Sequence, residues 1–190
     1  MHTSTDDGQT WTSPLVAPIP NSDITKYGNY VIAPSNNQVV YSDDVGLSWN
    51  HYSAGIPSGG TVYSVGVMGQ QAFAGVNNTI YKMEYPGAPW TNFSQGITGN
   101  GLISSIITVG NTLIVNNSLG IFRRTIEDSL WRPISQPPII YDMVYTNGFI
   151  FVATYDGVYF SDNLGKKFHP WNDGFPANMG QVENLFSDGD

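Results

Sequence analysis

The 190-residue sequence contains no cysteine and only three histidines. Without cysteine the chain forms no disulfide and offers no thiolate to a metal ion, but the compartment stays open because many exported bacterial proteins also lack cysteine. His2, His51 and His169 do not have the HxxxH or HExxH spacing that brings two imidazoles to one metal. We therefore expect no metal site and no cofactor.

Charged residues are also scarce, at 12% of the chain, and the formal net charge is −8. A nucleic-acid partner needs a stripe of basic side chains that neutralises several phosphates. The seven basic residues form no such stripe and are scattered as Lys26, Lys82, Arg123, Arg124, Arg132, Lys166 and Lys167. The charge pattern thus argues against a nucleic-acid partner.

Long apolar runs are missing as well, since no run approaches the 18 residues typical of a membrane-spanning helix. We expect no membrane insertion. Met1 to Thr3 lead directly into the first repeated motif, so we expect a mature or trimmed chain without a signal peptide. An acidic surface rich in Asn, Gly and Tyr is often found outside the cytoplasm, and we expect a secreted, periplasmic or cell-surface protein.

What the sequence does have is a repeat of about 40 residues. Tryptophans stand at positions 11, 49, 90 and 131, and Phe168 continues the series. Two of them close the same eight-residue phrase, STDDGQTW at 4–11 and SDDVGLSW at 42–49, and SDNLGKKF at 161–168 is a third copy. Such a period indicates one supersecondary unit repeated several times.

Each repeat contains four short segments of strand-like residues separated by turn residues. In one repeat the predicted strands are 61–67, 71–75, 79–83 and 90–93; in the next two they are 103–108, 112–115, 120–124 and 131–134, then 141–145, 149–153, 157–161 and 167–171. Four antiparallel strands per 40 residues are typical of a β-propeller blade. The fold class is therefore all-β, with no confident helix.

The two complete phrases resemble the Asp box, or bacterial neuraminidase repeat, of a propeller class that includes sialidases, xyloglucanases, sortilin-type receptors and photosystem-assembly factors. The resemblance implies that the box is the hairpin between the third and fourth strands of a blade. A serine and a carboxylate would bond free backbone groups there, glycine would supply a positive φ, and the aromatic ring would pack between sheets. We expect this structural role for Ser4, Asp6, Gly8, Trp11, Ser42, Asp44, Gly46, Trp49, Ser161, Asn163, Gly165 and Phe168. We also expect the five tryptophans in the core, although Trp171 follows the start of a fourth strand and is a candidate for exposure.

We predict a single propeller domain over 1–190, with repeats at about 12–49, 50–90, 91–131 and 132–171. The two ends, 1–14 and 180–190, would form a fifth, split blade that lacks residues for its second strand. Either the ring closes with this thin blade, or the chain is part of a larger propeller with open edges. Open edges predict self-association.

The rim opposite the boxes holds the turns between second and third strands and the links between blades. Paired residues recur there at Asn36-Asn37, Asn77-Asn78, Asn116-Asn117 and Tyr155-Asp156, and we interpret the asparagine pairs as tight-turn residues. First strands carry a recurrent polar position, at Ser64, Ser105, Asp142 and Asn184, which we place near a central channel. The candidate ligand-binding residues on this rim are Tyr63, Tyr141, Asp142, Tyr155, Asp156 and Glu183.

Known activities of the class make specific demands. Sialidases hold the substrate carboxylate with three arginines from separate blades, whereas all three arginines here lie in one repeat. An inverting hydrolase needs two carboxylates, with Asp142 and Asp156 as the first candidates and Asp173 and Glu183 as others, but xyloglucanases of this class draw them from two propellers. We therefore expect a non-catalytic exported module that binds a glycan or a protein surface, with a glycoside hydrolase, or part of one, as the alternative.

Overall fold

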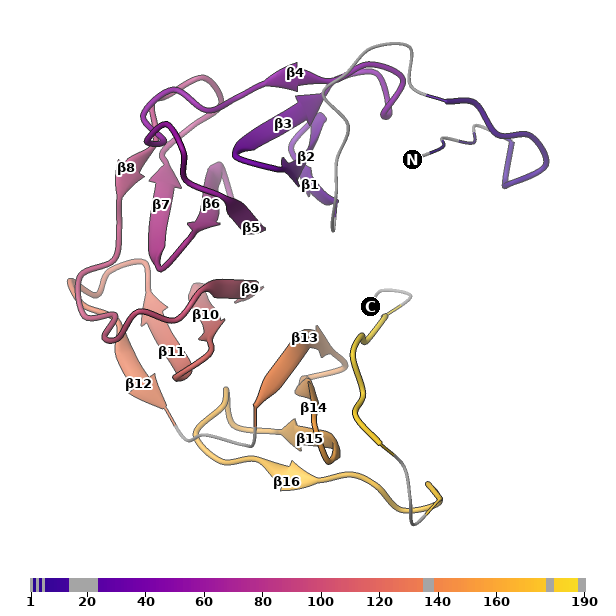
Figure 1. Cartoon of the computed structure of the whole chain (residues 1–190), viewed down its shortest axis with the longest axis vertical. Helices are drawn as coiled ribbons and strands as arrows, with labels where there is room; N and C mark the ends of the chain where they lie inside the picture. The colour runs from indigo at the N-terminus through magenta and orange to yellow at the C-terminus, as the bar shows by residue number, and fades with distance from the viewer. Residues whose placement is uncertain are drawn as a thin grey trace. The chain divides into compact units, whose positions relative to one another are not determined.

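The computed structural model describes residues 2, 4, 6–13, 24–134, 139–176 and 180–187. These residues form two compact units, Met1–Phe93 and Ser94–Asp190, and each is described by itself. Within the described ranges the chain is all-β, with four antiparallel sheets of four strands each (Figure 1). No helix in these ranges has the length and apolar character needed to span a membrane.

The first unit holds two sheets. The first blade consists of β1 (Thr25–Tyr27), β2 (Tyr30–Ser35), β3 (Gln38–Ser42) and β4 (Asn50–His51). The second blade consists of β5 (Val62–Met68), β6 (Gln71–Val76), β7 (Thr79–Met83) and β8 (Thr91–Asn92). In both sheets each strand pairs with the next one along the chain, which is the order expected of a propeller blade.

The second unit repeats this arrangement. The third blade consists of β9 (Ile103–Val109), β10 (Thr112–Asn117), β11 (Gly120–Thr125) and β12 (Arg132–Ile134). The fourth consists of β13 (Ile140–Thr146), β14 (Phe149–Thr154), β15 (Gly157–Ser161) and β16 (His169–Pro170). The predicted all-β fold of four-stranded blades is thus confirmed, and the predicted third strands 79–83 and 157–161 match the structure residue for residue.

The hydrophobic core of each unit lies between its two blades. In the first unit Ile32 and Val39 of the first blade pack with Val62, Ala74 and Met83 of the second. In β6, the second strand of the second blade, side chains are buried on both faces of the sheet. This burial accounts for the nearly continuous apolar run Gln71–Val76. Each fully buried side chain of this kind contributes about 1.5–3 kcal/mol relative to exposure.

In the second unit the corresponding core joins the third and fourth blades. Ile114 and Ile121 pack against Met143, Ile150 and Val152, and partly buried rings surround them. The repeat of about 40 residues therefore has a physical cause within each unit, because the two blades cover each other's apolar faces.

Tryptophan burial follows the same rule. Trp49, Trp90 and Trp131 are only 2–3% exposed, as expected for residues between sheets. The expectation of a buried core residue is wrong for Trp11, which is 63% exposed, and Trp171 is 55% exposed. The backbone N–H groups of Trp90 and Trp131 donate to the carbonyls of Ala54 and Gln95, in the links that follow the preceding blades.

The interpretation of the paired asparagines as turn residues needs one correction. Asn36 and Asn77 have φ near +50° and lie in turns, as expected. Asn116 and Asn117 instead end β10 and are buried at 2% each. The turn that follows is formed by Ser118 and Leu119, and its Leu119 N–H donates to the Asn117 side-chain oxygen. The asparagine pair in this blade therefore supports the turn from within the strand.

Candidate binding site

The first strand of three blades contains a β-bulge at the same position. In β5, Val62 and Ser64 pair with two consecutive residues of β6, so the residue between them has no partner. The corresponding residues of β9 pair in the same way with β10, and those of β13 with β14. The extra residues, Tyr63, Ser104 and Tyr141, are left out of the pairing and their side chains are exposed. Bulges are frequent beside binding sites because they redirect a side chain.

The recurrent polar position of the first strands lies one residue after this bulge. Ser64 and Ser105 are buried, at 8% and 9% exposure, and Asp142 is half-buried. Asn184, which belongs to the segment 180–187, is exposed. The accessible residue of each first strand is therefore the bulge residue, and the serines that follow it belong to the interior.

The segment 180–187 lies along the fourth blade. The Val182 N–H donates to the Thr154 carbonyl at 3.0 Å, and the Leu185 N–H donates to the Asp142 carboxylate at 2.9 Å. The other carboxylate oxygen of Asp142 accepts from the Met143 N–H at 2.8 Å. Asp142 therefore binds the segment through one carboxylate oxygen, while its other oxygen is held by the backbone of β13.

This attachment brings most of the predicted binding residues together. The Tyr141 hydroxyl lies 3.4 Å from the Gln181 side-chain oxygen, and the Gln181 amide donates to Glu183 at 2.6 Å. Because Val182 bonds to Thr154, the turn at Tyr155 and Asp156 lies beside them. We call this surface the rim site and define it by Tyr141, Tyr155, Asp156, Gln181 and Glu183.

Asp156 is held by the turn that contains it. Its oxygens lie 2.8 Å from the Thr154 hydroxyl and 3.1 Å from the Tyr159 hydroxyl, which donates to it. Burial, followed by this contact with Asp156, raises the pKa of Tyr159. Tyr155 itself is 65% exposed, so the rim site presents a free aromatic ring beside anchored carboxylates.

The structure therefore brings five of the six predicted binding residues to one surface of the second unit. The sixth, Tyr63, belongs to the first unit, where it is the bulge residue equivalent to Tyr141. Sequence reasoning missed Gln181 and Ser104. Ser104 was detectable by its alignment with Tyr63 and Tyr141, whereas Gln181 depends on how the segment 180–187 attaches.

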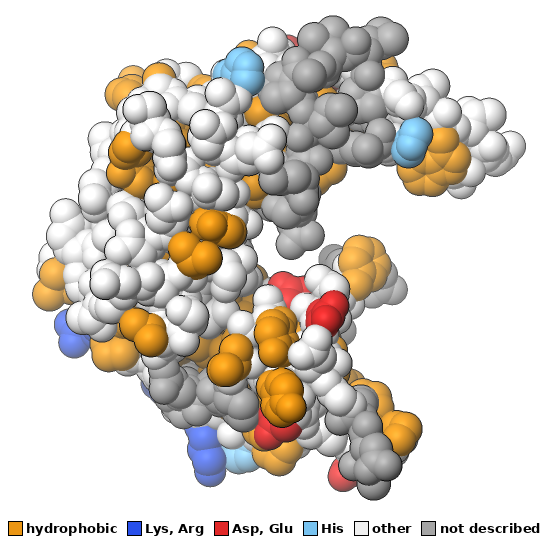
Figure 2. Space-filling model, in the orientation of Figure 1, with side chains coloured by type: hydrophobic (Ala, Val, Ile, Leu, Met, Phe, Trp, Pro, Cys, Tyr) orange, Lys and Arg blue, Asp and Glu red, His pale blue; other side chains and the backbone are white. Residues whose placement is uncertain are grey.

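Figure 2 shows hydrophobic and acidic side chains exposed next to one another in the region of the fourth blade and the segment 180–187. The arrangement offers aromatic rings, carboxylates and an amide to a ligand. Within the described residues no three His, Asp or Glu side chains are grouped so that they could hold a metal ion.

The box turns have a different role, because their polar groups bond within the turn. In the second box the Ser42 hydroxyl donates to Asp44 and accepts from the Gly46 N–H, both at 2.7 Å. Asp44 also accepts from the backbone N–H and the hydroxyl of Ser48, which lowers the pKa of Asp44 to about 2. Ser4 and Asp6 make the same contacts in the first box, and Ser161 with Asn163 makes the corresponding backbone contacts in the third.

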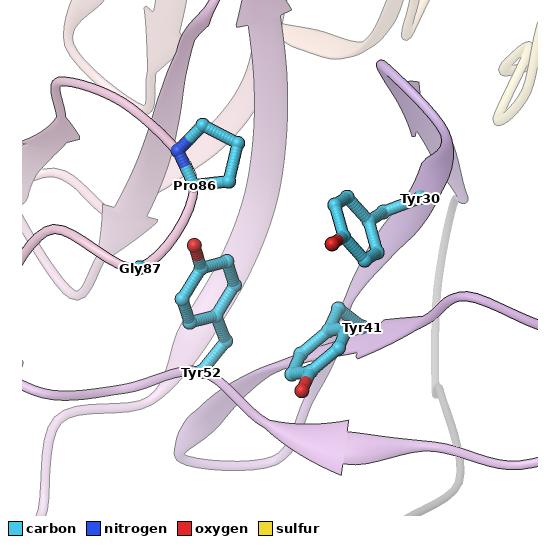
Figure 3. Close-up of a pocket in the computed structure, with 5 residues that line it drawn as sticks. All are labelled: Tyr30, Tyr41, Tyr52, Pro86 and Gly87. Carbon is cyan, nitrogen blue, oxygen red and sulfur yellow. The ribbon is translucent and has the colours of Figure 1, made fainter.

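One pocket that the sequence did not indicate lies on the side of the boxes, between the two blades of the first unit. It has a volume of about 190 Å³ and is lined by Tyr30, Tyr41, Tyr52, Pro86 and Gly87 (Figure 3). The Tyr41 ring lies 5.6 Å from Tyr30, edge to face, and 5.0 Å from Tyr52. Burial, with smaller effects of Tyr30 and Tyr41, raises the pKa of Tyr52. The pocket is small and aromatic.

Comparison with known proteins gives no match to a protein-family model or to a curated protein. Solved structures do match. The extracellular domain of the putative one-component system BT4673 from B. thetaiotaomicron has a TM-score of 0.64 at 15% identity, covering 77% of this chain and 21% of that one. YCF48 bound to D1 peptide has a TM-score of 0.63 at 14% identity, covering 76% of this chain and 52% of that one.

PorZ, a bacterial surface component of the type-IX secretion system of Porphyromonas gingivalis, gives a TM-score of 0.58 at 14% identity. The match covers 77% of this chain and 20% of PorZ. The chain thus spans between a fifth and about a half of the length of these three proteins. The identities are low, so these likenesses concern the fold alone, and the chain has an all-β, β-propeller-like fold.

Proposed function

We propose that the chain is a non-catalytic exported binding module that recognises a glycan or a protein surface through the rim site. The observation that carries the proposal is the connected group of Tyr141, Gln181 and Glu183 beside the exposed ring of Tyr155. Aromatic faces with adjacent hydrogen-bonding groups suit the apolar and polar faces of a sugar ring, and they equally suit a polypeptide surface.

The carboxylates of this surface favour binding over hydrolysis. A glycoside hydrolase needs one carboxylic acid that gives up a proton and a second carboxylate that is free to activate water or attack the sugar. Asp142 uses both oxygens on backbone N–H groups, and Asp156 accepts from the Tyr159 hydroxyl. Carboxylates engaged in this way are suited to holding the loop, which supports the binding module over the hydrolase alternative.

The arginines are arranged differently from a carboxylate clamp. Arg124 is 7% exposed, and its Nε–H donates to the Asp128 carbonyl at 2.8 Å. A guanidinium held in this way supports its own loop.

An exported location is supported by two of the similar structures, which are those of an extracellular domain and of a bacterial surface component. The third is described as bound to a peptide, which makes peptides a sensible first ligand class beside glycans. These descriptions concern those proteins, and for the present chain they guide the choice of ligands to test.

The test is a glycan array and a peptide array probed with the wild-type chain, Tyr155→Ala and Glu183→Gln. Tyr85→Ala is the matched control, because Tyr85 is similarly exposed, at 58% against 65%, and lies in the other unit. We expect a ligand whose affinity falls about tenfold or more with the rim variants and stays unchanged in the control. Measurable polysaccharide turnover that disappears in Asp156→Asn would overturn the proposal, and so would a ligand indifferent to both rim variants.

A further inference from the structure

The position that Tyr41 has in the first blade is held by a basic residue in the next two blades. Tyr41 of β3 pairs with Asn50, the first residue of β4. Lys82 of β7 pairs in the same way with Thr91, the first residue of β8. Arg123 of β11 takes this position in the third blade, where it pairs with the first residue of β12. The second and third blades therefore carry a cation where the first blade carries an aromatic ring.

In the second blade this cation lies over an aromatic ring. Lys82 Nζ is 5.0 Å from the centre of the Phe93 ring, a distance at which the π-face attracts a positive charge. The Phe93 N–H donates to the carbonyl of the second residue of β7, and the Tyr52 N–H donates to that of the second residue of β3, both at 2.8 Å. Tyr52 is therefore the equivalent of Phe93, so the first blade has a ring in both positions.

These two rings line the aromatic pocket between the blades of the first unit. Tyr41 and Tyr52 form it together with Tyr30, Pro86 and Gly87, and its volume is about 190 Å³ (Figure 3). The rings of Tyr30 and Tyr41 are inclined by 86° and those of Tyr41 and Tyr52 by 57°, so they surround the space from several directions. A cavity of about 150 Å³ accommodates one benzene molecule. The pocket is therefore large enough for a compact group of a few heavy atoms.

The charge of the first unit favours a positive ligand for this pocket. The described residues that line the pocket include no basic side chain. Six residues of the unit are acidic and only two are basic, Lys26 and Lys82, and Lys82 is paired with Glu84 at 2.6 Å. Asp43, two residues after Tyr41, takes the position of Glu84 and is exposed. A cation would therefore approach a predominantly acidic unit.

The lining suits an alkylated ammonium group better than a primary one. A primary ammonium has three N–H donors and is strongly hydrated, so it needs acceptors such as the carboxylate beside Lys82. A trimethylammonium group has no N–H donor, and its methyl groups can contact ring faces directly. We propose that the pocket binds the alkylated ammonium group of an external ligand between the rings of Tyr30, Tyr41 and Tyr52. The pocket belongs to the first unit and the rim site to the second, so the two proposals are independent.

The test compares two probes that share a shape and differ in charge. Choline ends in a trimethylammonium group, and its neutral carbon analogue has a tert-butyl group in that place. Both are titrated into the wild-type chain and followed by NMR. We expect choline to bind about tenfold or more tightly than the analogue, because only the cation is attracted to the ring faces. Equal affinities of the two probes would overturn the proposal, since burial of methyl groups alone would then account for binding.

Two substitutions of Tyr41 separate the ring from its hydroxyl group. Tyr41→Leu should weaken choline binding by about tenfold or more, whereas Tyr41→Phe should keep the affinity within about threefold because the ring face remains. Tyr85→Leu is the matched control, since Tyr85 is an exposed tyrosine of the same unit that is not among the residues lining the pocket. Unchanged binding in Tyr41→Leu, or equal losses in Tyr41→Leu and Tyr41→Phe, would contradict the proposed ring contacts.

A second pair of probes identifies the source of the ammonium group. A short peptide that contains trimethyllysine is titrated beside the same peptide with unmodified lysine. Binding of choline without the trimethylated peptide indicates a small molecule, and binding of the trimethylated peptide without choline indicates a modified polypeptide; either result supports the proposal. Equal binding of the two peptides would overturn it, and so would a wild-type chain that binds neither choline nor the trimethylated peptide.

Discussion

Gly55 lies so close to the backbone of Trp90 that a Cβ on Gly55 would overlap the Trp90 carbonyl oxygen. The atom in the way is backbone, so it moves only if the second blade shifts as a whole. This relationship makes Gly55 part of the packing between blades.

We therefore expect Gly55→Ala to lower the free energy of unfolding by roughly 3 kcal/mol or more, through overlap and the unfavourable φ together. Gly110→Ala is the control, because Gly110 also has positive φ but open space around it, and it should cost only about 1 kcal/mol. Urea denaturation of both variants gives the comparison. Equal losses would mean that the Trp90 contact has no part in the effect.

Val45 has φ +59°, a conformation that β-branched residues rarely adopt, and its side chain is 71% exposed. The first box has Asp7 at this position, with φ +54°. We expect Val45→Asn to raise the free energy of unfolding by about 1 kcal/mol, because asparagine tolerates the left-handed region. Val45→Ala, which removes the branch without adding a polar group, should give a smaller gain in the same denaturation experiment. A loss of stability in Val45→Asn would contradict the explanation.

The pKa of Asp44, lowered from 3.8 to about 2 chiefly by the Ser48 hydroxyl and backbone N–H, makes the stability of the second box depend on pH. A carboxyl whose pKa is lower in the folded state stabilises the fold above pH 3.8, and this stabilisation is lost as the pH falls through about 2. We expect Asp44→Asn to remove this part of the pH dependence between pH 4 and 2.

Asparagine is a suitable replacement because Asn163 makes the equivalent backbone contacts in the third box. The measurement is the free energy of unfolding as a function of pH for wild type and variant. Parallel curves over that pH range would show that the Asp44 contacts do not persist in solution.

The Asn117 side-chain nitrogen is buried and makes no hydrogen bond within the described residues. Thr154 occupies the same position in the fourth blade, and its hydroxyl bonds within the following turn. We expect Asn117→Thr to stabilise the chain by about 1 kcal/mol, because an unsatisfied donor is removed while an acceptor for the turn is kept.

Asn116→Thr is the comparison for this experiment. The Asn116 amide donates to Ser104 Oγ and to the Ile140 carbonyl, so its replacement should be destabilising by about 1–3 kcal/mol. Thermal and urea unfolding of both variants distinguish the two positions. A destabilised Asn117→Thr would mean that the Asn117 amide is satisfied in solution.

The strands and box turns were predictable because their causes are local. The strand Thr79–Met83 follows from alternation and flanking turn residues, and the bonds between Ser42 and Gly46 connect residues four apart. The bulge at Tyr63 was not predictable, since it depends on which residues of β6 pair with β5.

The candidate site was predictable to a similar extent. Tyr155 and Asp156 were found from the repeat register, whereas Gln181 joins them only through the bond between Val182 and Thr154. Trp11 was assigned to the core by analogy with Trp49, and the analogy failed because burial is a property of the neighbouring blade. The turn after β10 was predicted at Asn116 and Asn117, two residues before its actual position, because β10 is longer than expected.

The short range of the box contacts has a consequence for how the chain folds. Ser42, Asp44, Gly46 and Ser48 lie within seven residues, so the turn closes almost no loop and loses little chain entropy when it forms. Strand pairing in each blade likewise links only neighbours along the chain. Such turns are available as early nucleation sites, and hairpins can extend from them before any blade meets the next.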